Sequence, residues 1–323
     1  MPPILLIDSG TSTTRVRLVQ DGRVHLEIRR AVGAAAGAGG ENAELRQALS
    51  ACLAEMAEAR PEAMAAVPAA LLSGMISAPS GLEEIAHLTG PVDLGALHQA
   101  VVWRQYPDLW DRPMGYIPGV KFVSGDLVDQ DVVRGEETEL AGYALGHPGD
   151  FLALHVGSHH KALWVRDGWL TASRTALTGE MLTALATGTI LKDSITLPAG
   201  GPEDLEAARQ GARDALQVGT ARALFLTRVM RLNAGASETS AASYYMGALA
   251  AEDLRMLLGM RLPELPLLLY GREGFCKLLA ELVAEHLPGN AAAVLGQQQS
   301  DDLAVLGASR VAQALQEEGR FPC

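Results

Sequence analysis

The chain has 323 residues, a formal charge of −12 and only 5% aromatic residues. Its length exceeds that of most single hydrophobic cores and predicts two domains of roughly 150 residues each. An acidic chain without a run of Lys or Arg excludes a general nucleic-acid surface, because phosphate backbones select clustered basic residues.

The cysteines and the N-terminus indicate a cytoplasmic protein. Cys52, Cys276 and Cys323 are scattered and lack CxxC spacing, which argues against a disulfide scaffold or a structural zinc site and favours a reducing cytosol. The stretch before Asp8 is too short and uncharged for a signal peptide, and no run of about 18 apolar residues is present to span a membrane. We therefore expect no membrane partner.

A strand and turn pattern occurs twice in the chain. Residues 3–30 read as strand, turn, strand, turn, strand, and the second turn contains Asp21-Gly22, which is a strong hairpin signal. Residues 151–174 repeat this plan, with a small polar turn at Gly157 and an Asp-Gly turn at Asp167. This self-similarity predicts two topologically related halves.

The remaining segments supply helices and a few strands. Apolar residues at helical spacing predict an amphipathic helix over residues 42–59. Further helices are expected at residues 135–146, 178–191, 203–217, 219–233, 238–258, 273–287 and 301–317. Short apolar strands are expected at residues 69–73, 265–270 and 291–295, so the C-terminal half alternates strand and helix as α/β proteins do.

The small polar turns of the two repeats are typical of phosphate-binding hairpins. Gly10 allows close approach of the backbone, and Thr11, Ser12 and Thr13 offer N–H and hydroxyl donors to phosphate oxygens. Gly157 and Ser158 offer the same in the second half. Two such hairpins facing each other would grip one nucleotide, although neither GxxxxGK[ST] nor GxGxxG is present. Alternatively, the Gly, Ser and Thr residues of these segments only form turns, in which such residues are common.

Four blocks resemble a known family, namely residues 8–15 (DSGTSTTR), 134–140 (RGEETEL), 157–161 (GSHHK) and 177–180 (LTGE). In order and spacing they are similar to the 2-dehydro-3-deoxygalactonokinase family, from Ile4 to about Ala314. The resemblance implies a duplicated ribonuclease-H-like (actin-like ATPase) fold of class α/β, with domains at residues 1–147 and 148–323 and ATP in the cleft between them. It also implies Mg²⁺, a 2-keto-3-deoxy sugar acid as substrate and its 6-phosphate as product. The sequence does not reveal the oligomeric state, and a homodimer is one possible assembly.

The chain departs from the family pattern at Ser9, Thr13, Val156 and His160. The family usually has Trp, Asn, Pro and a small residue at these positions. These changes motivate a second hypothesis, an ATP-gated regulatory or binding module of the actin and chaperone type. A third hypothesis is a phosphohydrolase that acts on polyphosphate or guanosine phosphates.

Asp8 ends the first strand directly before the glycine turn. There a carboxylate would hold Mg²⁺ through water while the metal bridges phosphate oxygens. The alternative is an Asp that caps its own turn. Arg15 on the next strand is a candidate for pairing with a substrate anion, or else with a carboxylate.

The densest acidic block contains Asp131, Glu136 and Glu137 beside Gly135, at an expected helix start. Phosphoryl transfer to a hydroxyl needs a carboxylate that orients the alcohol and accepts its proton. We expect one of these three residues to be the base and favour Glu136, because Gly-Glu-Glu resembles the acidic block of exopolyphosphatases. Alternatively, these acids only complement the helix dipole.

The remaining candidates are assigned by residue type and by the resemblance. Arg134 suits bidentate capture of the sugar-acid carboxylate, and Arg174 competes for that role. Lys161 is expected to contact the transferred phosphate, and Gly271 falls in the segment that the family uses near the nucleotide base. Thr178 and Glu180 start a helix near the substrate, with Thr178 as an alternative helix cap. His159 and His160 point to opposite faces of a strand, so we place only His159 among the substrate contacts.

Overall fold

The computed structural model describes residues 2–37, 42–260 and 265–322. The chain forms two compact units. Unit 1 consists of Met1–Gly149, Arg166–Ala172 and Asp301–Cys323, and unit 2 consists of Asp150–Val165 and Ser173–Ser300. The division into domains at residues 1–147 and 148–323 stays a prediction, because compactness alone does not show which segments fold independently.

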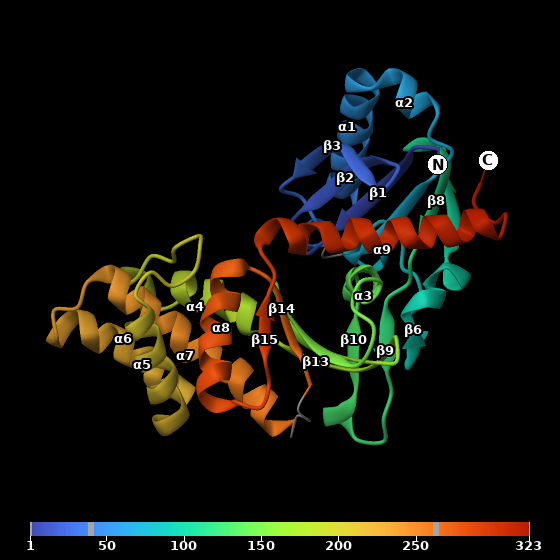
Figure 1. Cartoon of the computed structure of the whole chain (residues 1–323). Helices are drawn as coiled ribbons and strands as arrows, with labels where there is room; N and C mark the ends of the chain where they lie inside the picture. Colours follow the sequence, from blue (N-terminus) through green and yellow to red (C-terminus); the bar gives the residue numbers. More distant parts are fainter. Residues whose placement is uncertain (1, 38–41, 261–264, 323) are drawn as a thin grey trace. The chain divides into compact units, whose positions relative to one another are not determined.

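Unit 1 is built on a six-stranded mixed sheet (Figure 1). The strand order is β3-β2-β1-β4-β8-β7, with β2 antiparallel to β1 and β4 parallel to it. The bounds of these strands are β1 (Ile4–Ser9), β2 (Thr14–Gln20), β3 (Arg23–Arg30), β4 (Ala70–Gly74), β7 (Val102–Tyr106) and β8 (Trp110–Tyr116).

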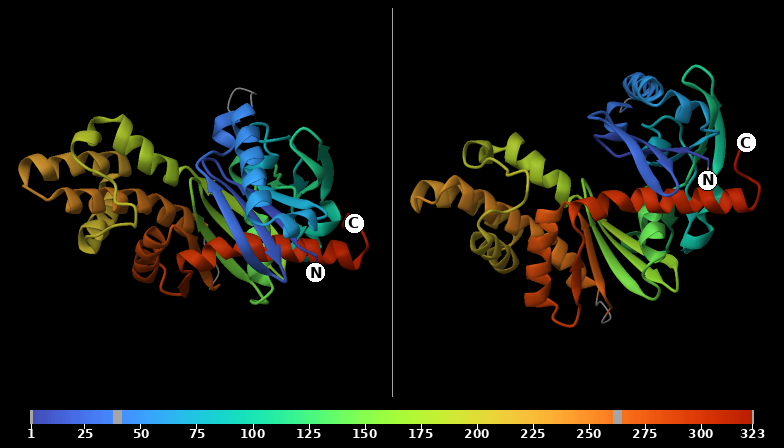
Figure 2. Two further views of the ribbon diagram at one scale, coloured as in Figure 1. Left: turned by 90° about the horizontal axis from the view of Figure 1, so that it is seen from above. Right: turned by 45° about the horizontal axis from the view of Figure 1, so that its top comes forward.

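Helices cover this sheet. The helices of unit 1 are α1 (Ala43–Ala59), α2 (Pro61–Ala65), α3 (Glu136–Ala144) and α9 (Gln297–Glu317), of which residues 297–300 belong to unit 2. Figure 2 shows α1 beside the blue strands β1 to β3. Alternate residues of a strand face one side of a sheet, so Leu5 and Ile7 pack with Leu49, Cys52 and Met56 of α1 in one core.

A small second sheet in unit 1 was not expected from the sequence. It has the order β10-β9-β5, from β5 (Leu88–Thr89), β9 (Val120–Phe122) and β10 (Asp131–Val133). A further strand, β6 (Val92–Asp93), pairs with Trp169 and Leu170 at the start of β13. Strands of two or three residues are too short to show the alternation that predicts a strand.

Unit 2 repeats the topology of unit 1. Its strands follow the order β15-β14-β11-β12-β13, with β12 antiparallel to β11 and β14 parallel to it. The arrangement β3-β2-β1-β4 in unit 1 therefore corresponds to β13-β12-β11-β14 here. The bounds are β11 (Phe151–Val156), β12 (His160–Arg166), β13 (Trp169–Ala176), β14 (Leu267–Gly271) and β15 (Ala292–Val294).

The helices of unit 2 enclose a second core. They are α4 (Thr178–Gly188), α5 (Leu205–Val218), α6 (Thr220–Asn233), α7 (Glu238–Gly259) and α8 (Glu273–His286). In Figure 2, α5, α6 and α7 lie side by side in yellow and orange. Leu152 and Leu154 of β11 pack with α7 and with Phe275 of α8, which shows that the sheet and the helices share this core.

The structure confirms the expected hairpins and most of the expected helix bounds. Asp21 and Asp167 both have positive φ angles, 51° and 49°, as the two predicted Asp-Gly turns require. α9 begins four residues before the predicted start at 301. In the described ranges 2–37, 42–260 and 265–322, no helix combines the length and apolarity needed to cross a membrane.

Candidate active site

The turn after β1 has the backbone form of an anion-binding loop. Gly10 N–H donates to Thr13 O at 2.9 Å, and Ala35 N–H donates to Thr11 O at 2.8 Å. A Cβ on Gly33 would lie 2.5 Å from Gly10 O, so this loop packs directly on the turn. Within the described residues, no acceptor is paired with the N–H groups of Thr11, Ser12 and Thr13, which makes them candidate donors to ligand oxygens, although Gly33 packs against the nitrogen of Ser12.

Asp8 lies at the carboxyl end of β1 and is paired with Arg15. Arg15 Nη1 is 3.4 Å from Asp8 Oδ2, and Arg15 Nη2 is 3.3 Å from Asp301 Oδ1 of α9. About a quarter of each side chain remains exposed. Arg15 thus holds Asp8 by one oxygen, in agreement with the expected pairing with a carboxylate.

The acidic block forms the first turn of α3, as expected. Gly135, with φ of 110°, precedes the helix. Glu136 Oε2 accepts the N–H of Arg134 at 3.0 Å, while both oxygens of Glu137 accept the N–H of Gly135, at 2.8 and 2.9 Å. The Thr138 hydroxyl also donates to Glu137 Oε1 at 3.2 Å. Glu137 is fully buried and Glu136 is 7% exposed, so Glu137 has the stronger role in holding the helix start.

Gly74, at the end of β4, brings Asp8 and the start of α3 together. Its φ is 82°, and a Cβ there would lie 2.6 Å from Ser9 O and 3.2 Å from Asp8 Oδ1. A Cβ on Gly135 would lie 3.2 Å from the Cα of Gly74. Asp8, Gly74 and Gly135 are therefore neighbours, and the carboxylate of Asp8 lies near the first turn of α3.

Arg134 lies beside a histidine that the sequence did not single out. Its Nη1 donates to the carbonyl and the hydroxyl of Ser77, the latter at 2.7 Å, and its Nη2 lies 2.9 Å from Nε2 of His87. Burial lowers the pKa of Arg134 below its ordinary value. Burial, Arg134 and Lys121 lower the pKa of His87, so this imidazole is neutral at pH 7.

The second glycine turn, in unit 2, packs on α4. A Cβ on Gly179 would lie 2.1 Å from Gly157 O and 2.5 Å from Ser158 O, so the helix start contacts the turn backbone. His159 Nε2 is 3.1 Å from Glu180 Oε1, and this pair is partly exposed. These contacts join four of the predicted site residues of unit 2 in one place.

A buried hydrogen-bond network lies behind that turn. Thr178 Oγ1 donates to Asp253 Oδ1 at 2.8 Å, and His160 Nδ1 is 2.7 Å from Asp253 Oδ2, with His160 and Asp253 both fully buried. Because α4 begins at Thr178 and its N-cap residue is Leu177, without a side-chain cap hydrogen bond, the alternative of Thr178 as a helix cap is wrong. The network fixes α4 and β12 to α7.

Three further predicted residues lie on strands. Asp131 is in β10 opposite Phe122, Lys161 is buried in β12 opposite His155, and Arg174 is in β13. Gly271 ends β14 with φ of 112° and pairs with Val156. Their roles stay predictions.

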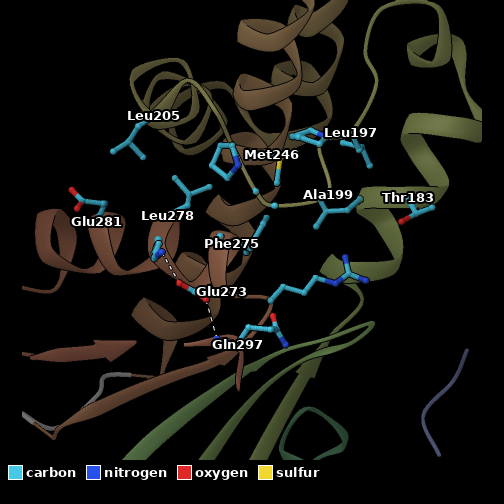
Figure 3. A pocket seen from close by; sticks show the side chains of 18 residues that line it. Thr183, Leu197, Ala199, Leu205, Met246, Glu273, Phe275, Leu278, Glu281 and Gln297 are labelled. Atoms are coloured by element: carbon cyan, nitrogen blue, oxygen red, sulfur yellow. Dashed lines mark hydrogen bonds and ion pairs between the residues drawn. The ribbon is translucent and has the colours of Figure 1, made fainter. Parts of the chain in front are cut away.

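Unit 2 contains a large pocket beside Gly271 (Figure 3). Its volume is about 910 Å³, and Leu197, Leu205, Met246, Phe275 and Leu278 give it apolar walls. One side is polar: Glu273 accepts the N–H of Gln297 at 2.9 Å and pairs with Lys277 at 2.6 Å. A pocket of this size with apolar walls and one polar side is typical of small-molecule sites.

The same pocket depends on a close backbone contact. A Cβ on Gly274 would lie 1.4 Å from Gly200 O, so the loop before α5 lies directly on the first turn of α8. The sequence did not reveal this contact or the role of Gly74, although Gly200-Gly201 and the Ser73-Gly74-Met75 block were visible signals.

The oxygen donors at Asp8 fit a Mg²⁺ ion that is bound mainly by phosphates and water. Mg²⁺ usually takes one or two protein carboxylates and keeps several waters. In the parts of the chain that the structure describes, no group of three His, Cys, Asp or Glu residues has the geometry of a complete metal site. Asp8, with one oxygen paired to Arg15 and the other facing Gly74, is the residue that would hold the ion.

Comparisons with known proteins agree with this geometry. The sequence matches the 2-keto-3-deoxy-galactonokinase family over residues 8–306. It is 31% identical over 192 residues to a Rhizobium meliloti (strain 1021) protein named probable 2-dehydro-3-deoxygalactonokinase DgoK1, and this alignment spans 58% of each protein. The chain thus aligns with less than two thirds of that relative.

Solved structures extend the comparison to the whole fold. A Sinorhizobium meliloti protein assigned as a 2-dehydro-3-deoxygalactonokinase superposes with a TM-score of 0.73 at 25% identity, over 97% of this chain and 99% of that one. The activator of 2-hydroxyisocaproyl-CoA dehydratase from Clostridium difficile superposes with a TM-score of 0.52 at 9% identity, over 99% and 98%, and shows the fold alone. The expected duplicated ribonuclease-H-like fold of the actin-like ATPases is confirmed. With its family match over nearly the full length, this chain belongs to the 2-keto-3-deoxy-galactonokinase family.

Proposed function

We propose that this protein transfers the γ-phosphoryl group of ATP to a hydroxyl of a 2-keto-3-deoxy sugar acid, 2-dehydro-3-deoxygalactonate in the first instance, and forms its 6-phosphate. The observation that carries the proposal is the position of Asp8 and the acidic start of α3, which Gly74 and Gly135 hold together behind a turn with open N–H groups. Family membership supports the substrate class.

The pocket of unit 2 is the proposed site of the nucleoside part of ATP. Its apolar walls suit a purine ring, and its polar side offers Glu273, Lys277 and Gln297 to the ribose. Gly271 and the turn at Gly157 are close to each other, because β14 pairs with β11 and Val156 O accepts the N–H of Arg272 at 2.9 Å. The triphosphate of the bound ATP would extend from the pocket along this backbone, with Ser158 and Lys161 as candidate contacts.

The turn at Gly10 is the proposed second contact for phosphate oxygens. Its three open N–H groups donate to anions without cost in side-chain entropy, because Gly33 and Ala35 already fix the backbone. When bound at Asp8, Mg²⁺ neutralises charge that develops on the phosphate oxygens. Arg15 orients the Asp8 carboxylate through its ion pair.

Glu136 is the proposed general base. One of its oxygens is fixed by the N–H of Arg134, which orients the carboxylate. Glu137 suits the role less, because the N–H of Gly135 and the hydroxyl of Thr138 occupy its oxygens and no part of it is exposed. In the reaction the acceptor hydroxyl oxygen bonds to the γ-phosphorus, the bridging oxygen leaves with ADP, and Glu136 takes the hydroxyl proton.

A coupled assay of ADP release tests this function. Purified protein with ATP and Mg²⁺ should release ADP only when 2-dehydro-3-deoxygalactonate is added. Phosphate release without any sugar acid would favour the phosphohydrolase instead, and ADP binding without turnover would favour an ATP-gated module. Homodimer formation and residence in the cytoplasm stay predictions.

A further inference from the structure

The position of Arg134 requires an explanation that the phosphoryl-transfer chemistry does not give. Its guanidinium is half-buried, and its partners are the Ser77 carbonyl, the Ser77 hydroxyl, the Ile85 carbonyl and the His87 ring. All four are neutral. Across residues 2–37, 42–260 and 265–322, no carboxylate lies within 4 Å of this cation. The carboxylates of Glu137 and Glu84 favour this charge electrostatically, but the groups that accept its hydrogen bonds are neutral. The guanidinium can therefore still take an anion as a hydrogen-bonded partner.

The donors of Arg134 are only partly used. A guanidinium has five N–H groups. Both N–H groups of Nη1 point to the Ser77 and Ile85 acceptors, and one of Nη2 points to His87. The described residues thus leave Nε–H and one Nη2–H without a protein acceptor, and two N–H groups are what bidentate binding of a carboxylate needs.

His87 adds a second donor with no charge of its own. Its Nε2 lies 2.9 Å and its Nδ1 lies 3.3 Å from Arg134 Nη2. Because a guanidinium only donates, one nitrogen of the neutral ring accepts from Arg134 and the other carries the ring proton. The charged groups that act on this ring are Arg134, Lys121 and Glu84.

The small sheet of unit 1 builds this arrangement. His87 directly precedes β5, Arg134 directly follows β10, and β9 pairs with both strands. Gly119 permits the approach, since a Cβ there would lie 2.4 Å from Val133 O and 3.1 Å from Cδ2 of His87. The buried Ser77, 0% exposed, then fixes Arg134 to the segment that follows Gly74.

We infer that Arg134 and His87 form the subsite that binds the carboxylate of the acceptor substrate and so select sugar acids over neutral sugars. The inference rests on the proposed function. Arg134 and Glu136 are two residues apart, so their backbones are separated by at most about 7 Å. Glu136 Oε2 accepts the N–H of Arg134 at 3.0 Å, so the proposed base lies at the backbone of the residue whose guanidinium would bind the carboxylate.

Specificity is the first test. The ratio of kcat/KM for 2-dehydro-3-deoxygalactonate to that for its uncharged C1 amide is measured for the wild type, R134A, R134K and H87Q. The wild type should prefer the acid strongly, and R134A should lower this ratio by about 100-fold, with most of the loss in KM for the acid, because a charged hydrogen-bonded pair is lost. R134K should lower it by about 10-fold, since the charge stays but the bidentate fork is gone.

A matched control is Arg112→Ala, which removes an exposed arginine of β8 that pairs with Asp111. It should leave the ratio unchanged. Equal losses of kcat/KM for acid and amide in both R134A and R134K would overturn the inference and show a structural role. If R134A does not fold, the acid-to-amide ratio of kcat/KM in R134K and H87Q tests the inference instead.

A binding test separates this inference from the proposed function. The pKa of His87 is followed by NMR without nucleotide, with and without the sugar acid and the amide. The acid, not the amide, should raise this pKa, because a bound carboxylate favours the protonated ring. A wild type that transfers phosphate but shows no such shift contradicts the subsite alone. A shift without phosphoryl transfer contradicts the proposed function alone. The absence of both the shift and phosphoryl transfer contradicts both.

Discussion

Gly74 and Gly271 occupy equivalent positions in the two units. Each ends the strand that runs parallel to the first strand of its unit, and each has a positive φ, 82° and 112°. A Cβ on Gly74 would lie 2.6 Å from Ser9 O, and a Cβ on Gly271 would lie 2.3 Å from Val156 O. Both units therefore need a residue without a side chain at the point where the strand end meets a glycine turn.

Replacement of either glycine by alanine should destabilise the protein by about 1–3 kcal/mol, since both the positive φ and the contact are strained. The free energy of unfolding in urea measures this change. The control is Gly22→Ala, which has φ of 71° but nothing within 4 Å of its Cβ position. Losses in G74A and G271A no larger than in G22A would show that the backbone contact has no energetic role.

The two adjacent glutamates of α3 should separate in function. Glu136→Gln should lower kcat by about 100-fold or more with ATP binding retained, because the base is lost. Glu137→Gln should lower the free energy of unfolding by about 1–3 kcal/mol, because a buried charge-assisted hydrogen bond is lost. Steady-state kinetics and urea unfolding of both variants test this assignment, and unchanged turnover in E136Q would move the base to Asp131 or Glu137.

The pocket of unit 2 should respond to added volume. Ala199→Trp places a large ring in the cavity of about 910 Å³ and should raise KM for ATP by about 10-fold or more, with little change in KM for the sugar acid. Leu258→Trp, on an exposed position of α7, serves as the control. If A199W binds ATP as the wild type does, the nucleoside lies elsewhere.

The buried network around Asp253 should be structural. Asp253→Ala removes the partner of both His160 and Thr178 and should cost about 3 kcal/mol or more of stability. Thr178→Val should cost about 1 kcal/mol and leave KM for the sugar acid unchanged. A raised KM in a stable T178V variant would instead support the predicted substrate contact of Thr178.

His87 should make stability depend on pH. Burial, Arg134 and Lys121 lower its pKa in the folded protein below the ordinary 6.5, while the unfolded chain binds the proton near 6.5. The unfolded state thus binds more protons than the folded state in this pH range. The stability that neutral His87 contributes is therefore lost as pH falls from about 6.5 towards the lower folded pKa. Urea midpoints between pH 7 and 5 should fall more for the wild type than for H87Q, and equal slopes would contradict a neutral His87.

The sequence predicted features that depend on local patterns. The Asp-Gly turns, the order of strands and turns in the two hairpin segments and the helical spacing in residues 42–59 depend on a few residues each, and the structure confirms all three. The equivalence of the turns at Gly10 and Gly157 followed from spacing alone, and the registers Ser9 to Thr14 and Val156 to His160 support it.

Long-range contacts could not be predicted in the same way. His87 and Arg134 are 47 residues apart and meet only through a sheet whose strands have two or three residues. The capping role considered for Thr178 was wrong, and its hydroxyl bonds Asp253, which is 75 residues away on α7. Nothing local in the sequence distinguishes such partners from other polar residues.

Transfer of labelled phosphate from ATP decides whether this protein phosphorylates the sugar acid. With γ-³²P-labelled ATP, Mg²⁺ and 2-dehydro-3-deoxygalactonate, the account predicts that the label appears in a phosphomonoester at C6 of the sugar acid, and that E136Q forms it at least about 100-fold more slowly. Label found only in inorganic phosphate, or unchanged ATP with correctly folded wild-type protein, would contradict the account.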